Sequence, residues 1–175
     1  MAIERAQFIE DLKKSYEIYY DLHSGDGTSG LPLEFRADFH SVGESYFIVK
    51  DAKIWTNETN EYVYVFSAPT FDAESVKRCV DYALEDGLAR VTPHKNHHYS
   101  NVITVFVAEE IGPDIRKVIA KQKFSKSYRM SPYGFSLLKT GFVDLSKGDY
   151  GTNAEGHDLI NFFKKLFPKK QFLKK

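Results

Sequence analysis

The sequence predicts an α+β (or α/β) protein in which helices pack on the faces of a mixed sheet. Two observations lead to this class. The spacing of apolar residues switches along the chain between the helical period and the period of a strand, and the elements follow the order α-β-β-β-α-β-α-β. A meander followed by a β-α-β crossover places antiparallel and parallel strands in one sheet. At 175 residues, we expect a single globular domain over residues 1–175.

The N-terminal half is predicted to hold one helix and a three-strand meander. Apolar residues recur every three or four positions in 3–22, which indicates an amphipathic helix. Small polar residues in 23–31 predict a flexible connector, whose glycines match no phosphate-loop spacing. The period then becomes two, with turn-forming residues at 41–44 and 57–61. The strands predicted from this period span residues 33–40, 46–55 and 62–66.

The C-terminal half is predicted to alternate helices with strands. Asp72 is a suitable N-cap for a helix that ends at Gly87, and Gly112 followed by Pro113 starts another. The remaining elements are a strand, a strand or hairpin, a short closing helix and a basic tail, at residues 102–108, 135–145, 162–167 and 168–175.

The single cysteine and the absence of long apolar runs indicate a cytoplasmic protein. Cys79 has no second cysteine to pair with, and it lies on an apolar helical stripe typical of a buried residue. The N-terminus lacks the basic-then-apolar order of a signal peptide, and no apolar run could cross a bilayer. We therefore expect no membrane partner and no cofactor, with a divalent metal left open.

The net charge of zero conceals a strong asymmetry. Residues 1–88 carry 17 acidic and 8 basic side chains, whereas residues 89–175 carry 7 and 16. Such a split suits a polyanion such as nucleic acid, or self-association with a second copy. Six basic residues, interleaved with Phe124 and Tyr128, are typical of a surface that follows phosphates: Arg116, Lys117, Lys121, Lys123, Lys126 and Arg129. The alternative is an ordinary helix whose outer face is solvated by lysine.

The order of the first six elements, over residues 3–108, resembles the restriction-endonuclease-like fold. Nucleases of that fold use an acidic residue near the second strand and an Asp-x-Lys or Glu-x-Lys pair on the next, since carboxylates hold Mg²⁺ and the lysine stabilises charge at the phosphate. The resemblance implies Asp51 and Lys53 as the pair, with Asp38 or Glu44 as the acidic partner. The predicted third strand carries no such pair, so a charged, exposed strand is the alternative interpretation.

Two further segments, KIWTNETNEY at 53–62 and PHKNHH at 93–98, resemble parts of an uncharacterised bacterial domain family. The resemblance extends over nearly the whole chain. It implies a bacterial, intracellular protein and brings no known activity or site residues.

Three histidines form the best candidate metal site. If their segment is helical, the spacing places His94, His97 and His98 on one side, within reach of one ion. A carboxylate such as Glu58 or Asp38 would complete the coordination. No His-Glu-x-x-His or paired-cysteine pattern accompanies them, so solvated histidines in a loop are the alternative.

Two functional hypotheses follow. The first is a non-enzymatic binding or interaction module that uses the basic C-terminal half. The second is a metal-dependent phosphodiesterase or nuclease of restriction-endonuclease-like type.

Overall fold

The computed structural model describes residues 4–25, 27, 29–45 and 55–167. Helices within this part of the chain are α1 (Arg5–Glu17), α2 (Ala73–Ala89), α3 (Pro113–Ala120) and α4 (His157–Leu166), with a 3₁₀ turn at Ala154–Gly156. The strands are β1 (Asp21–Ser24), β2 (Leu33–Ser45), β3 (Trp55–Ala68), β4 (His97–Ala108), β5 (Ser125–Ser127), β6 (Phe135–Asp144) and β7 (Asp149–Thr152). None of the helices in the described residues has the length and apolar character needed to cross a membrane.

The strands form one mixed sheet, which confirms the predicted class. Their order is β1-β2-β3-β4-β6-β5, and β7 also pairs with β6. The first three strands are an antiparallel meander, whereas β3, β4 and β6 run parallel. Helices α2 and α3 provide the two crossovers between the parallel strands, as β-α-β geometry requires.

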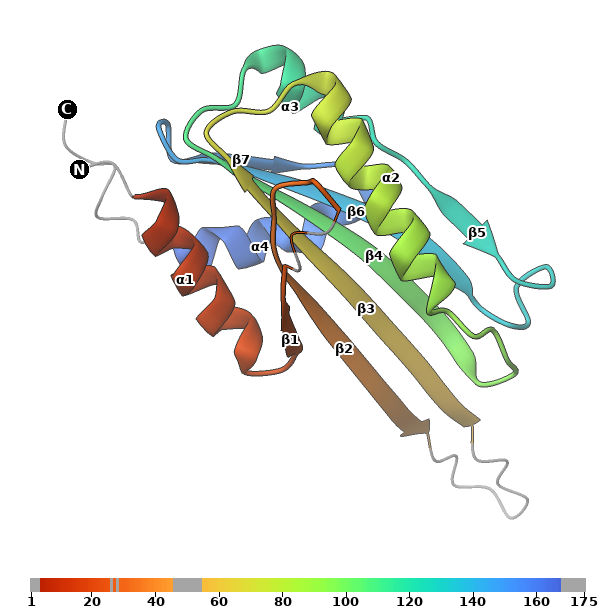
Figure 1. The fold of residues 1–175 in the computed structure, drawn as a ribbon. Helices are drawn as coiled ribbons and strands as arrows, with labels where there is room; N and C mark the ends of the chain where they lie inside the picture. The colour runs from red at the N-terminus through yellow and green to blue at the C-terminus, as the bar shows by residue number, and fades with distance from the viewer. Residues whose placement is uncertain (1–3, 26, 28, 46–54, 168–175) are drawn as a thin grey trace.

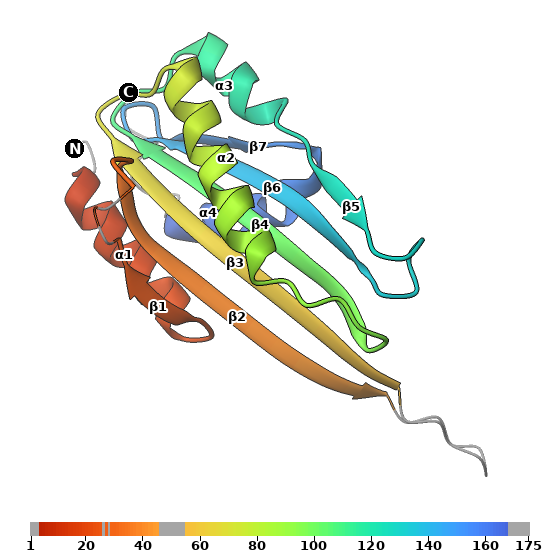
Figure 2. The ribbon, with the colours of Figure 1, turned by 45° about the vertical axis from the view of Figure 1, so that its right-hand side comes forward.

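Helices cover both faces of the sheet. Figures 1 and 2 show α2 and α3 on one face and α1 and α4 on the other. Successive side chains of β3 point to opposite faces of the sheet and so contact both helix layers. Val63 and Val65 pack with α1 and α4, while Tyr64 and Phe66 pack with α2 and α3. All four of these side chains are fully buried.

Strands β2 and β3 are longer than predicted. The predicted turn at 41–44 lies inside β2, and the one at 57–61 lies inside β3, where Gly43 pairs with Asn57. Turn-type residues are tolerated here because each strand continues to pair with a neighbour. Most of the predicted strand at 46–55 lies outside the described residues.

The first strand of the meander is β1, in a segment predicted as helix and connector. Helix α1 ends at Glu17, and in the turn that follows the N–H groups of Tyr19 and Tyr20 both donate to the carbonyl of Tyr16. The chain then pairs with β2 in the register Leu22 to Ala37. The prediction of helix to residue 22, and of a connector from residue 23, was therefore wrong.

The predicted N-cap of α2 is confirmed, whereas the predicted end of this helix is not. Asp72 caps α2, because its side chain accepts a hydrogen bond from the N–H of Ser75 and the Ser75 hydroxyl completes a capping box. Gly87 does not end this helix. It lies within the last turn, where an added Cβ would be 2.8 Å from a methyl group of Val102. The predicted basic tail at 168–175 lies outside the described residues.

Candidate functional site

Polar residues occupy the sheet face beyond the C-terminal end of α2. The even-numbered residues of β3 and β4 face α2, as the burial of Tyr64 and Phe106 against it shows. The same alternation places Asn60 and Ser100 on this face, near the start of each strand. The hydrogen bond from the Tyr62 hydroxyl to the carbonyl of Arg90, at 3.4 Å, marks where the helix layer stops. We call the surface beyond it the polar end of the sheet.

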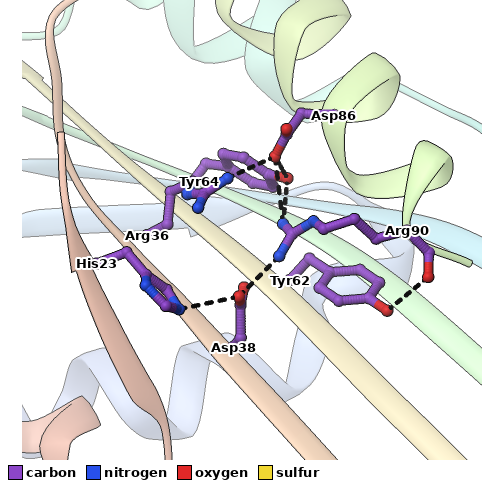
Figure 3. A network of polar contacts seen from close by, with 7 residues as sticks. All are labelled: His23, Arg36, Asp38, Tyr62, Tyr64, Asp86 and Arg90. Carbon is purple, nitrogen blue, oxygen red and sulfur yellow. Dashed lines mark hydrogen bonds and ion pairs between the residues drawn. The ribbon is translucent and has the colours of Figure 1, made fainter. Parts of the chain in front are cut away.

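Arg90, the C-cap of α2, is the centre of an ionic network at this boundary (Figure 3). Its guanidinium donates to Asp38 at 2.7 Å and to the Tyr64 hydroxyl at 2.6 Å, and it lies 3.3 Å from Asp86. The same group stacks on the ring of Tyr62, 4.2 Å from its centroid. One side chain therefore joins α2 to both β2 and β3.

Further contacts neutralise the acids of this network. Asp86 also accepts from Arg36 at 2.9 Å, and Asp38 lies 3.2 Å from Nε2 of His23. Burial alone would raise the pKa of Asp86, but the Tyr64 hydroxyl and the two arginines lower it. Asp38, predicted as a nuclease ligand, thus has its Oδ2 engaged by the guanidinium of Arg90 and close to the imidazole of His23.

A chain of hydrogen bonds crosses the polar end from β2 to the loop before β4. Nδ1 of His40 lies 2.5 Å from Oδ1 of Asn60, whose amide donates to Glu58 and to Ser100, each at 3.2 Å. The other oxygen of Glu58 lies 2.7 Å from Nε2 of His94. Burial would raise the pKa of Glu58, but these amide and imidazole contacts lower it.

His97 is held in one tautomer by its two partners. Its Nδ1 lies 2.7 Å from the carbonyl of Tyr133, and since a carbonyl only accepts, this nitrogen carries the proton. Nε2 therefore accepts from the hydroxyl of Ser100 at 2.9 Å. Both side chains are buried, with exposed fractions of 3% for His97 and 0% for Ser100, so this pair is not open to a substrate.

The three predicted metal ligands do not converge. Their segment is a loop and turn that enters β4 at residue 97, so the helical arrangement was wrong. His98 is exposed and lies against the rings of Tyr99 and Phe135. Both nitrogens of His97 are engaged, and Nδ1 of His94 accepts from the N–H of Asn96 at 3.2 Å.

No cluster in the described part of the chain brings three or more His, Cys, Asp or Glu side chains into an arrangement that could hold a metal ion. For the nuclease residues, Asp51, Lys53 and the side chain of Glu44 lie outside the described residues.

Five of the six predicted polyanion-binding residues form an exposed surface. Lys117 and Lys121 lie one turn apart at the end of α3. Lys123 follows in the connection to β5, Lys126 lies in β5, and Arg129 lies in the loop after it. We call this surface the basic strip; its members are Lys117, Lys121, Lys123, Lys126 and Arg129. None of them has an acidic side chain within 4.0 Å among residues 4–25, 27, 29–45 and 55–167.

Arg116 does not belong to the basic strip. Its guanidinium pairs with buried Asp144 at 2.6 Å and with Asp149, and Nε donates to the carbonyl of Ile111 at 2.9 Å. It also lies over the ring of Phe142, 5.4 Å from the centroid. This arginine joins α3 to the sheet.

The loop after β5 connects the basic strip with the polar end. Lys126 lies 5.4 Å from the centroid of the Tyr128 ring, and Arg129 lies 4.8 Å from that of Tyr133. Tyr128 in turn contacts the hydroxyl of Ser136 at 2.9 Å and the ring of His97 at 5.7 Å. Arg129 therefore lies on a loop that packs against the sheet, and Lys126 lies in β5 directly before that loop.

Comparison with known protein families matches residues 4–165 to a domain of unknown function, DUF8052. The chain belongs to this family. The match confirms the prediction of an uncharacterised domain family. No curated protein and no solved structure matches the chain.

The DUF8052 match includes the Arg90 network, the polar end and the whole basic strip. Sequence reasoning missed the roles of Arg90, Asn60 and Ser100. The one local signal for the last two was a polar residue at an inward position of a strand that is otherwise apolar on that face.

Proposed function

We propose that this DUF8052 domain is a non-enzymatic module that binds nucleic acid through the basic strip. The observation that carries the proposal is that Lys117, Lys121, Lys123, Lys126 and Arg129 are all exposed within one segment of the chain, without acidic partners in the described residues. A surface lysine or arginine without a carboxylate partner can neutralise a phosphate of the nucleic acid. The phosphate backbone then releases a condensed counterion, which favours association.

Three other lysines lack this property. Lys13, Lys77 and Lys147 each lie within 4.0 Å of a carboxylate, at 3.0, 2.6 and 3.7 Å respectively. A cation that already has a carboxylate partner gains less from a phosphate, because the pair must first separate. The difference between the basic strip and these paired lysines therefore supports a specific surface over general positive charge.

The aromatic residues of the loop support phosphate contact without sequence reading. Tyr128 and Tyr133 hold two cations over their rings, which restricts the conformations of these long side chains before a ligand arrives. Less conformational entropy is then lost on binding. Lysine and arginine side chains that contact phosphates carry no sequence information, whereas specificity comes from contacts to base edges. We therefore expect the basic strip to show little preference for one nucleic-acid sequence over another. The single buried Cys79 suits a reducing compartment such as the cytoplasm.

The test is a fluorescence-anisotropy titration of the full chain against labelled DNA and RNA of about 20 nucleotides, from about 50 mM salt upward. Five phosphate contacts predict a slope of log K against log salt of about −4.5 for duplex DNA and about −3.5 for single strands. The triple variant Lys121→Gln, Lys126→Gln, Arg129→Gln is expected to bring the duplex slope to about −2 and to weaken binding at low salt at least tenfold.

The matched control removes the same number of charges from paired positions: Lys13→Gln, Lys77→Gln, Lys147→Gln. Its affinity and salt slope should equal those of the unmodified chain. Equal losses in both triple variants would show that total charge, and not the strip, drives binding. If no probe binds at low salt, nucleic acid is discarded, and self-association, measured by sedimentation, becomes the explanation of the charge split.

The nuclease alternative lacks a comparable observation, since Asp38 is paired with Arg90 and His23. The same titration with Mn²⁺ added tests it directly. Loss of intact probe, sensitive to Asp38→Asn, would restore the enzyme hypothesis.

A further inference from the structure

We propose that a groove on the opposite face of the sheet binds a small organic cation that carries an apolar or aromatic body. The groove has a volume of about 440 Å³ and lies between the C-terminal end of α1 with residues 18–20 that follow it, Glu61 of β3, Ile103 of β4 and helix α4. This volume lies within the range of sites that hold small molecules. The site is independent of the basic strip, which lies with α3 and β5.

The walls of the groove are rich in aromatic rings. Tyr16 meets Tyr20 edge-on with a centroid distance of 5.0 Å, and it meets Phe162 of α4 at 5.1 Å. Tyr19 adds a fourth ring at the mouth, where its side chain is 74% exposed. The rings of Tyr16, Tyr19, Tyr20 and Phe162 line the groove, and an aromatic ring attracts an ammonium group that lies over its face.

A carboxylate without a cationic partner lies at the inner side of the groove. Glu61 of β3 accepts hydrogen bonds from the hydroxyl of Tyr20 and from the amide of Asn101, the latter at 3.3 Å. Both donors are neutral, and no ion pair to Glu61 occurs among the residues that the structure describes. A half-buried carboxylate whose donors are all neutral has no bound cation to displace before it binds a cationic ligand.

The hydroxyl of Tyr16 supplies a second free polar group. Tyr16 is 5% exposed and lines the groove, yet its hydroxyl has no hydrogen-bond partner within the described part of the chain. Burial, followed by the charges of Glu61 and Asp158, raises the pKa of Tyr16, and the same causes raise that of Tyr20. Both phenols therefore stay neutral, and the Tyr16 oxygen remains able to accept a hydrogen bond from an ammonium group.

The other charged groups at the groove lie nearer its edge. Asp158 pairs with Lys139 at 2.7 Å, so this acid already has a cationic partner. Lys165 of α4 is exposed and has no acidic partner in the described residues. The inner end thus carries the charge of Glu61, while Lys165 at the rim opposes the entry of a cation. Removing the charge of Glu61 should therefore weaken binding of a cation, and removing the charge of Lys165 should strengthen it.

The test uses three probes of matched shape: phenethylamine, its alcohol analogue and 3-phenylpropionate. Each is titrated into the full, isotope-labelled chain while the amide resonances of Tyr19, Tyr20 and Phe162 are followed by NMR. The ammonium probe is expected to bind at least about tenfold more tightly than the carboxylate, because a charge-assisted hydrogen bond to Glu61 discriminates between them. Glu61→Gln, which keeps an acceptor for Tyr20, should abolish this preference.

Lys165→Met is expected to strengthen binding of the ammonium probe several-fold and to weaken that of the carboxylate. Preference for the carboxylate, equal binding of all three probes, or no shift of the groove resonances at the highest soluble concentration would each overturn the proposal. Lys14→Met, on the exposed side of α1, controls for the loss of one charge. The dispersion of the amide spectrum shows that each variant is folded before it is scored.

Discussion

Arg90 at the end of α2 and Asp38 of β2 form an ion pair of 2.7 Å between residues that are 52 positions apart in the sequence. The pair fixes the end of a crossover helix against a strand that is not its own neighbour in the chain. Both side chains are about three-quarters buried, with exposed fractions of 28% and 24%. Removing one member therefore leaves the other with a poorly solvated charge.

The first prediction concerns this pair. Arg90→Met is expected to lower the free energy of unfolding by about 2–3 kcal/mol, at the low end for buried pairs because of the partial exposure. Arg90→Lys should recover only part of this loss, since lysine has neither the planar fork nor the stacking on Tyr62. Urea unfolding with an unchanged m-value measures both. Arg78→Met, on the exposed side of α2, should stay within about 0.5 kcal/mol; an equal loss there would contradict the assignment.

The second prediction concerns pH. Asp144 is fully buried and accepts from the N–H groups of Ile111 and Lys147, from the hydroxyl of Ser146 and from Arg116. Burial alone would raise the pKa of Asp144, but these bonds lower it. The folded pKa is below the unfolded value, so the stabilisation is complete above the unfolded value and is lost as the pH falls through the folded one.

Stability should therefore be flat from neutral pH to about pH 5 and fall steeply below about pH 4. Asp144→Asn should lower the plateau by about 3 kcal/mol, because Arg116 loses its buried partner, and should make the acid limb shallower. Chemical unfolding at a series of pH values measures this. Asp81→Asn, which breaks an exposed pair with Lys77, should leave both features unchanged. An acid limb unaltered by Asp144→Asn would assign the acid sensitivity to other carboxylates.

The helices could be predicted because their signals are local. The cap at Asp72 lies within four residues of its partner Ser75, and the apolar stripe of α2 repeats within each turn. The lengths of β2 and β3 could not be predicted in this way. Residues such as Gly43 and Asn57 favour turns in isolation, but here they pair with each other in the antiparallel ladder of β2 and β3. That pairing depends on the register of the whole ladder, which neither local sequence contains.

In the candidate site too, local features could be predicted from the sequence, whereas contacts between distant residues could not. The exposed lysines of α3 and β5 were identified because a run of cations is visible in the sequence. The partners of Arg116 and Arg90 were not, because Asp144 and Asp38 lie 28 and 52 residues away. The local pattern around Asp38 predicts a metal ligand. Nothing in that pattern shows that the guanidinium of Arg90, from another element, already binds this carboxylate.

The third prediction concerns the single thiol. Burial raises the pKa of Cys79 to about 12, and the residue is 0% exposed against the sheet. At neutral pH almost no thiolate is present, so iodoacetamide should modify the native chain only at the rate of unfolding. Mass spectrometry should show rapid labelling in denaturant and almost none without it. Rapid labelling of the native chain would show that α2 separates from the sheet far more often than this packing allows.

The last prediction tests whether the loop after β5 shapes the basic strip. Gly134 has φ +79°, and an added Cβ would lie 2.4 Å from the carbonyl oxygen of His98. Because that atom belongs to the backbone of β4, no side-chain rotation relieves the clash. Gly134→Ala is expected to cost about 2–4 kcal/mol in stability, combining left-handed strain with displacement of the strand.

The matched control is Gly30→Ala, which has φ +65° and no atom within 4 Å of the added Cβ. It carries the left-handed strain alone and should cost about 1 kcal/mol. Under conditions where both variants stay folded, only Gly134→Ala should reduce the salt-dependent affinity for nucleic acid, because the displaced loop carries Arg129 and supports Lys126 through Tyr128. Equal affinities would mean that the cations act independently of the loop conformation that presents them.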